Sequence, residues 1–139
     1  MDRSELEGRL RAALLPRSEV LEAYLFGSQA SGRVQAHSDV DVAVFVDRGA
    51  LLRRGYGYAA DLTADLMRVL GSNEVDVVVL NDAPPLLYHR VLRDGLRILA
   101  RDLRATTTRE GSALSRYCDY VPQLAKIEAA RRGAAAARR

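Results

Sequence analysis

The chain lacks the features that would place it in a membrane or in an oxidising compartment. Its 139 residues contain one cysteine, Cys118, which excludes an internal disulfide and a zinc site built from several cysteines. No apolar run approaches the roughly 18–20 residues of a membrane-spanning helix. The N-terminal segment MDRSELEGRL carries acidic residues and has no apolar core of the signal-peptide type. We therefore expect a cytoplasmic protein without membrane attachment.

Strong charge of one sign is also missing from most of the chain. The formal net charge is +3, but residues 101–139 hold nine basic and four acidic side chains, whereas residues 1–100 hold twelve basic and fourteen acidic ones. The excess positive charge therefore belongs to the C-terminal segment, which either contacts an acidic partner or is solvated. The acidic body is not expected to bind nucleic acid directly.

Composition and periodicity predict one small domain of the α/β (α+β) class. Apolar residues make up 48% of the chain and charged residues 28%, which is ordinary for a globular protein. Short apolar, β-branched runs predict strands over 21–26, 40–46, 74–80 and 96–100. Helical spacing predicts helices over 5–15, 50–70, 86–93 and 112–130, the first begun by a Ser4–Glu7 capping box and the last interrupted by Pro122. This order indicates a mixed sheet of about four strands covered by helices, with a C-terminal helical extension.

Three acidic residues interrupt runs that otherwise read as buried strands. Asp39 and Asp41 are two residues apart, so their side chains project from the same face at the start of a strand. Asp76 repeats this pattern among four valines in the third strand. One such aspartate alone would be taken for a strand-edge residue facing water. Three carboxylates that would repel one another favour a bound hard cation, Mg²⁺ or Mn²⁺.

A glycine–serine pair follows the first predicted strand. Gly27 permits close backbone approach, and small residues come after it, so a phosphate could lie against backbone N–H groups and the Ser28 hydroxyl. The pair alone is weak evidence, because most such pairs are simply turns. Ten residues separate this pair from Asp39-x-Asp41, so the pattern predicts a phosphate-binding turn at a fixed spacing from the two carboxylates.

The segment GSQASGRVQAHSDVDVAV resembles the GS-x10-D-x-D signature of DNA polymerase β-like nucleotidyltransferases, and VDVVVL resembles the strand with that family's third carboxylate. The resemblance spans residues 20–101. The chain is too short for the second domain of the larger members. It is similar in length to the minimal nucleotidyltransferases (MNT), commonly the MntA-like antitoxins of HEPN/MNT toxin–antitoxin pairs.

This resemblance implies a polymerase β-like fold and transfer of AMP from ATP to a tyrosine of a partner HEPN RNase toxin. It implies that Asp39 and Asp41 bind two Mg²⁺ ions, with Mn²⁺ as a substitute. Asp76 would bind the catalytic ion and orient the attacking hydroxyl, and Gly27 and Ser28 would hold the β and γ phosphates. Residues 1–101 would form the nucleotidyltransferase domain. Residues 102–139 lie outside the matched part. Because a single domain without a substrate-capping domain would obtain its acceptor specificity from a docked protein, we expect residues 102–139 to form a helical extension that is part of the partner interface of a hetero-oligomer.

Two other functions stay open at this stage. The protein could be a non-catalytic antitoxin that masks its toxin by binding. It could also transfer a nucleotide to a small molecule such as an aminoglycoside, although the absence of a second substrate-binding domain makes this the weakest of the three.

Overall fold

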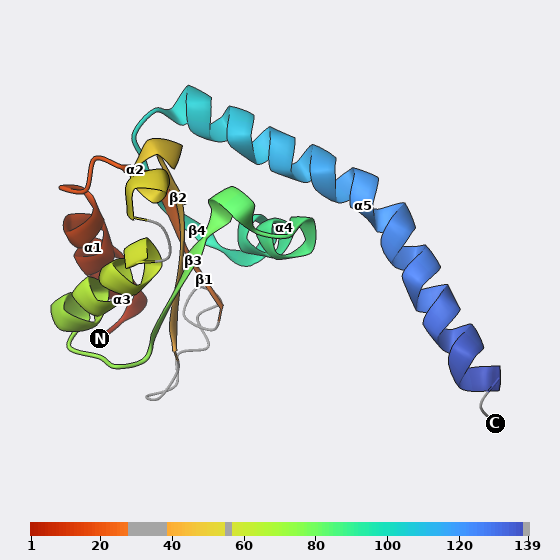
Figure 1. Cartoon of the computed structure of the whole chain (residues 1–139). Helices are drawn as coiled ribbons and strands as arrows, with labels where there is room; N and C mark the ends of the chain where they lie inside the picture. Colours follow the sequence, from red (N-terminus) through yellow and green to blue (C-terminus); the bar gives the residue numbers. More distant parts are fainter. Residues whose placement is uncertain (28–38, 55–56, 138–139) are drawn as a thin grey trace.

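The computed structural model describes residues 1–27, 39–54 and 57–137. Its centre is a four-stranded sheet in the order β3-β2-β1-β4 (Figure 1). The strands are β1 (Val20–Phe26), β2 (Val40–Val46), β3 (Val75–Val79) and β4 (Leu96–Ala100). β1 pairs antiparallel with both β2 and β4, whereas β2 and β3 are parallel. The predicted mixed sheet is therefore confirmed.

The parallel pair requires a crossover between β2 and β3, because two parallel strands cannot be joined by a tight turn. The crossover contains helices α2 (Arg48–Arg54) and α3 (Gly57–Leu70). Its length carries the chain back along the sheet, so β2 and β3 begin at the same end. This end carries the acidic residues singled out in the sequence.

One face of the sheet is covered by α3 together with α1 (Arg3–Leu14) (Figure 1). Alternate strand residues, among them Val42, Val44 and Leu25, form the larger hydrophobic core with leucines of both helices. Leu10, Leu14 and Leu62 are fully buried there. This alternation sends the intervening strand residues, including Asp41 and Asp76, to the opposite face.

The opposite face is covered by α4 (Pro85–Asp94) and the start of α5 (Leu103–Ala137). A smaller core lies beneath them and includes Tyr24, Tyr88 and Ala113. Beyond this contact α5 continues away from the domain, and its C-terminal end lies far from the sheet (Figure 1). Within the described ranges, no helix combines the length and the apolar character needed to cross a bilayer.

A buried ion pair fastens α5 to the sheet. Glu22 of β1 is 0% exposed, and its carboxylate accepts hydrogen bonds from Arg109 Nε at 2.7 Å and Arg109 Nη2 at 2.6 Å. Thr106 Oγ1 donates to the same carboxylate at 2.9 Å. The Arg109 guanidinium also lies over the Phe45 ring, 5.1 Å from its centroid. The buried charge is thus paired and hydrogen-bonded, as a buried carboxylate must be.

Three details of the predicted helices were wrong. The first helix is capped by Asp2, whose carboxylate accepts from the Glu5 N–H, and not by Ser4. Residues 48–70 form two helices around residues 55–56, which lie outside the described residues, instead of one helix from residue 50. Finally, the last helix begins at Leu103 instead of residue 112, extends to Ala137, and passes through Pro122 without ending. Pro122 is exposed, and so is Cys118, whose carbonyl loses a helix hydrogen bond there and can bind water instead.

Candidate active site

Two of the three carboxylates lie side by side in the sheet. Asp41 of β2 and Asp76 of β3 are register partners in the parallel pair, so their backbones are about 4.8 Å apart and their side chains share a face. Asp41 is half-buried and Asp76 is exposed. Asp39 precedes β2 by one residue and is also exposed. The sheet therefore fixes two of the acids and leaves the third at its margin.

The electrostatics of Asp41 show that its carboxylate lies within reach of the charges of the other two acids. The pKa of Asp41 is raised above its usual value, first by burial and then by the charges of Asp76 and Asp39. Both causes disfavour the ionised form. A cation between these carboxylates would reverse the effect, because it would replace repulsion with attraction.

The donor chemistry fits a hard divalent cation, since three carboxylates offer only oxygen ligands. Within residues 1–27, 39–54 and 57–137, however, no three histidine, cysteine, aspartate or glutamate side chains are already gathered as a metal-binding group. Strand pairing holds the backbones of Asp41 and Asp76 side by side, and Asp39 lies one residue before β2.

Gly27 closes the site on the side of β1. Phe26 is the register partner of Asp41, so Gly27 is the first residue beyond that rung. Gly27 has a φ of 77°, in the region that favours glycine. A Cβ built on Gly27 would collide with the Asp41 carboxylate. The glycine therefore allows the turn and leaves room for the carboxylate. Ser28, the other predicted phosphate-binding residue, lies outside the described residues.

Replacing Gly27 by alanine should therefore disturb the site directly. The positive φ costs a non-glycine residue about 1–2 kcal/mol, and the added methyl group must displace the Asp41 carboxylate. We expect the Gly27→Ala variant to lose most of the nucleotidyl transfer that the sequence resemblance implies while keeping its fold, measured by label transfer from ATP and by circular dichroism. Gly57→Ala is the matched control, because a Cβ there meets nothing within 4 Å. Unchanged activity in Gly27→Ala would contradict the assignment of this turn.

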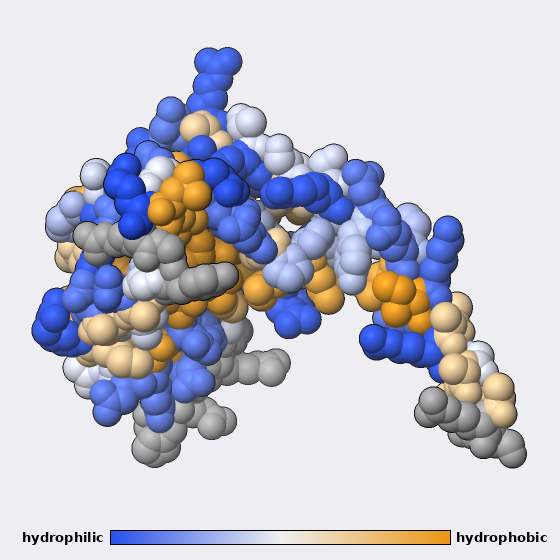
Figure 2. Space-filling model, in the orientation of Figure 1, coloured by the Kyte–Doolittle hydropathy of each residue, from blue (hydrophilic) through white to orange (hydrophobic). Residues whose placement is uncertain are grey.

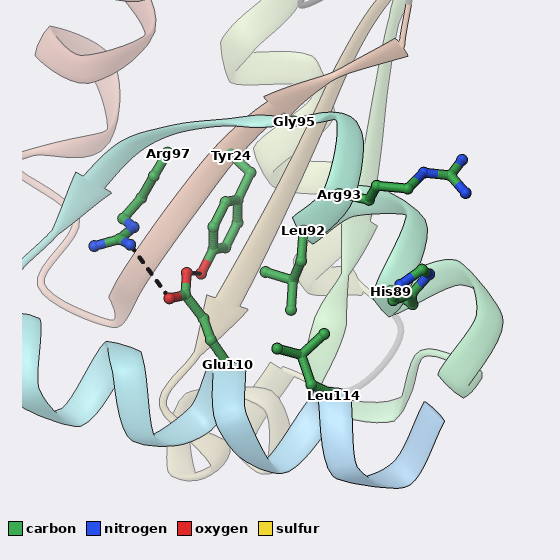
Figure 3. Close-up of a pocket in the computed structure, with 8 residues that line it drawn as sticks. All are labelled: Tyr24, His89, Leu92, Arg93, Gly95, Arg97, Glu110 and Leu114. Carbon is green, nitrogen blue, oxygen red and sulfur yellow. Dashed lines mark hydrogen bonds and ion pairs between the residues drawn. The ribbon is translucent and has the colours of Figure 1, made fainter. Parts of the chain in front are cut away.

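A cavity of ≈ 470 Å³ opens on the same face of the sheet, between β1, β4, α4 and α5 (Figure 3). Its floor is Tyr24, whose hydroxyl donates to Glu110 Oε2 at 2.6 Å, and Arg97 pairs with Glu110 Oε1 at 3.2 Å. Burial and the Glu110 carboxylate raise the pKa of Tyr24, so its hydroxyl stays protonated as a donor. Leu114 of α5 also lines the cavity.

Sequence reasoning missed the residues that hold this face together. Glu22 and Tyr24 lie inside a run read as an apolar strand, and their partners Arg109 and Glu110 are more than eighty residues away. One signal was present: a lone carboxylate, Glu22, at the second position of LEAYLF. A charge at that position of a core strand requires a partner, but the sequence does not say which arginine supplies it.

A mixed sheet with paired carboxylates beside a glycine turn is the arrangement of a nucleotidyltransferase domain. The family model described as polymerase beta, nucleotidyltransferase, matches residues 9–104, so this chain belongs to that family. The fold and the family indicated by the sequence motifs are thus confirmed.

Solved structures give the same fold. A chain of a toxin–antitoxin complex with AMP-PNP is 22% identical, with a TM-score of 0.73 over 90% of this chain and 98% of that one. A chain from the complex of tri-AMPylated Shewanella oneidensis HEPN toxin with MNT antitoxin is 20% identical, with a TM-score of 0.68 over 93% and 98%. A protein assigned as a minimal nucleotidyltransferase is 31% identical, with a TM-score of 0.57 over 69% and 95%. Among curated protein sequences, none matches this chain.

Proposed function

We propose that this protein is the antitoxin of a toxin–antitoxin pair and that it transfers AMP from ATP to a tyrosine of a HEPN-type RNase toxin. The observation that carries the proposal is the pairing of Asp41 with Asp76 on one rung of the sheet, beside Gly27. The family membership supports nucleotidyl transfer. This chain is similar to chains of complexes that contain AMP-PNP or an AMPylated HEPN toxin. This similarity supports ATP as the nucleotide donor and a HEPN-type toxin as the acceptor.

Each residue of the proposed site has its own role in the reaction. Gly27 and Ser28 hold the β and γ phosphates through backbone N–H groups and the Ser28 hydroxyl. Asp39, Asp41 and Asp76 would hold Mg²⁺, which supplies positive charge to the phosphates and to the acceptor oxygen. Asp76, the most exposed of the strand-borne acids, orients the acceptor hydroxyl and takes its proton.

The overall reaction balances without any further reactant. The tyrosine oxygen forms a bond to the α-phosphorus of ATP. The bond between the α-phosphorus and the oxygen that joins it to the β-phosphorus breaks, and pyrophosphate leaves. The tyrosine proton passes to Asp76 and then to solvent. The product is a phosphodiester between AMP and the tyrosine.

The test is to express the chain with its HEPN-type partner and determine the mass of the purified partner. We expect a mass increase of one or more adenylate groups located on tyrosine, together with loss of RNase activity. An inhibited but unmodified partner would support masking by binding instead. Transfer of label from ATP to an aminoglycoside, with none to the partner, would support the small-molecule alternative.

A further inference from the structure

The C-terminal helix carries a regular seam along one side. Positions that recur at alternating spacings of four and three residues are Thr106, Glu110, Ala113, Tyr117, Tyr120, Leu124 and Ile127. This is a seven-residue repeat, which keeps one side of a helix facing one neighbour along its whole length. The residues of α5 that contact the domain and those that extend past it therefore share a face.

The first half of the seam is already a packing surface. Thr106 bonds to the buried Glu22, Glu110 accepts from Tyr24, and Ala113 is 1% exposed in the core beneath α4. Tyr117 stacks on His89 of α4 with ring centroids 3.6 Å apart and planes within 3°. The domain therefore occupies the seam as far as Tyr117.

The second half has no such neighbour among the described residues. Tyr120, Leu124 and Ile127, which we call the distal seam, follow where α5 leaves the domain, and Val121 lies next to them on the helix. Ile127 is 43% exposed and the neighbouring Val121 is 40% exposed, whereas Tyr120 and Leu124 are half-buried. Figure 2 shows apolar surface on this part of α5, beyond the body of the domain. Exposed apolar side chains in a helical repeat are typical of a surface that packs against another helix.

Charge favours a different protein over a second copy of this chain. Residues 116–137 carry Arg116, Lys126, Arg131 and Arg132, against Asp119 and Glu128. Two copies of α5 would bring together two segments with a positive excess. A helix with acidic residues beside its apolar side would instead be complementary.

The comparisons add an independent reason. Only 102 residues precede α5, so the 90% and 93% alignments with chains of two-protein complexes must include most of this helix. The minimal nucleotidyltransferase aligns over 69% of this chain, which the residues before α5 can account for. The extended helix is therefore shared with proteins that were solved as complexes.

We propose that the distal seam binds one α-helix of a partner protein, and that the apolar side of this helix is flanked by acidic residues. The partner is the HEPN-type protein, so this inference rests on the proposed function for its identity. Binding along α5 would also place the partner beside the sheet face that carries Asp41 and Asp76, since α5 crosses that face.

The test compares two charge insertions on one helix. Leu124→Asp places a carboxylate in the distal seam, and Ala129→Asp places the same charge on an exposed position five residues later, which a helix turns away from the seam. We expect Leu124→Asp to weaken binding of the purified HEPN-type partner by about thirtyfold or more, by titration calorimetry. Ala129→Asp should bind within about twofold of the wild-type chain. Equal binding by all three proteins would overturn the proposal.

Two further measurements separate the possible causes. Leu124→Gln keeps a good helix former at this position and should still weaken binding about tenfold, so loss of helix alone cannot explain the result. Wild-type affinity should fall as salt rises, and an affinity independent of salt would contradict acidic flanks on the partner. If the wild-type chain binds but transfers no AMP, the proposed reaction fails and the binding result stands. If AMP is transferred while Leu124→Asp binds normally, only the interface proposal fails.

Discussion

Replacing Asp41 by asparagine is expected to reduce AMP transfer by more than about a hundredfold. Even residues that only support metal ligands change activity by about 10–100-fold when replaced, and Asp41 is placed as a ligand itself. The fold should survive, because the change removes a half-buried carboxylate that is repelled by Asp76 and Asp39. The melting temperature should therefore stay the same or rise. Transfer is measured with ATP labelled at the α-phosphate.

The matched control is Asp82→Asn, the same chemical change at an exposed carboxylate that only pairs with Arg48 at 3.5 Å on the surface. This variant should transfer AMP at the wild-type rate. If the Asp41→Asn protein also transferred AMP at the wild-type rate, the assignment of the paired carboxylates would be refuted, whatever the identity of the acceptor.

The second large effect is expected from the ion pair that fastens α5. Arg109→Met removes the guanidinium but keeps a long apolar side chain, and among the described residues it leaves the buried Glu22 carboxylate with the hydrogen bond from Thr106 alone. Breaking a buried pair in this way costs about 3–5 kcal/mol. We expect that loss in the free energy of unfolding by urea denaturation.

A double variant tests the cause. Glu22→Leu combined with Arg109→Met removes both charges, and such apolar replacements are often neutral, so most of the lost stability should return. Arg93→Met is the surface control, since Arg93 pairs with Asp94 in solvent and its loss should have a much smaller effect. If Arg109→Met were no more destabilising than Arg93→Met, α5 would not depend on this pair.

The strands could be predicted from the sequence because their residues are determined locally. Runs such as VDVAVFV are rich in β-branched residues, which favour a strand over a helix. The boundaries of β2 and β4 agree with the ranges predicted from the sequence. The N-cap of α1, Asp2, was missed because both Asp2 and Ser4 are near that end and either type of side chain can cap a helix. The passage of α5 through Pro122 was missed because a proline removes a helix hydrogen bond and usually ends or kinks a helix, whereas here the affected turn is exposed and the helix continues.

The site was predictable to the extent that it depends on strand periodicity. Asp39 and Asp41 share a face by spacing alone, and the position of Asp76 among valines pointed to the neighbouring strand. The register that places Asp41 opposite Asp76 depends on the crossover and could not be read from either segment. The contacts of Glu22 and Tyr24 with α5 join residues more than eighty positions apart, which no local pattern reports.

The parallel pairing of β2 with β3 also bears on the order in which the molecule folds. Asp41 and Asp76 are separated in sequence by the whole crossover, so we expect them to become neighbours only after α2 and α3 have packed and the loop between the strands has closed. The hairpin-like β1–β2 pair can form earlier, because its contacts are more local. The carboxylates would therefore come close enough to repel one another late in folding, when most of the apolar core is already buried. We expect divalent cations to slow unfolding more than they speed refolding, since they stabilise contacts absent from the transition state.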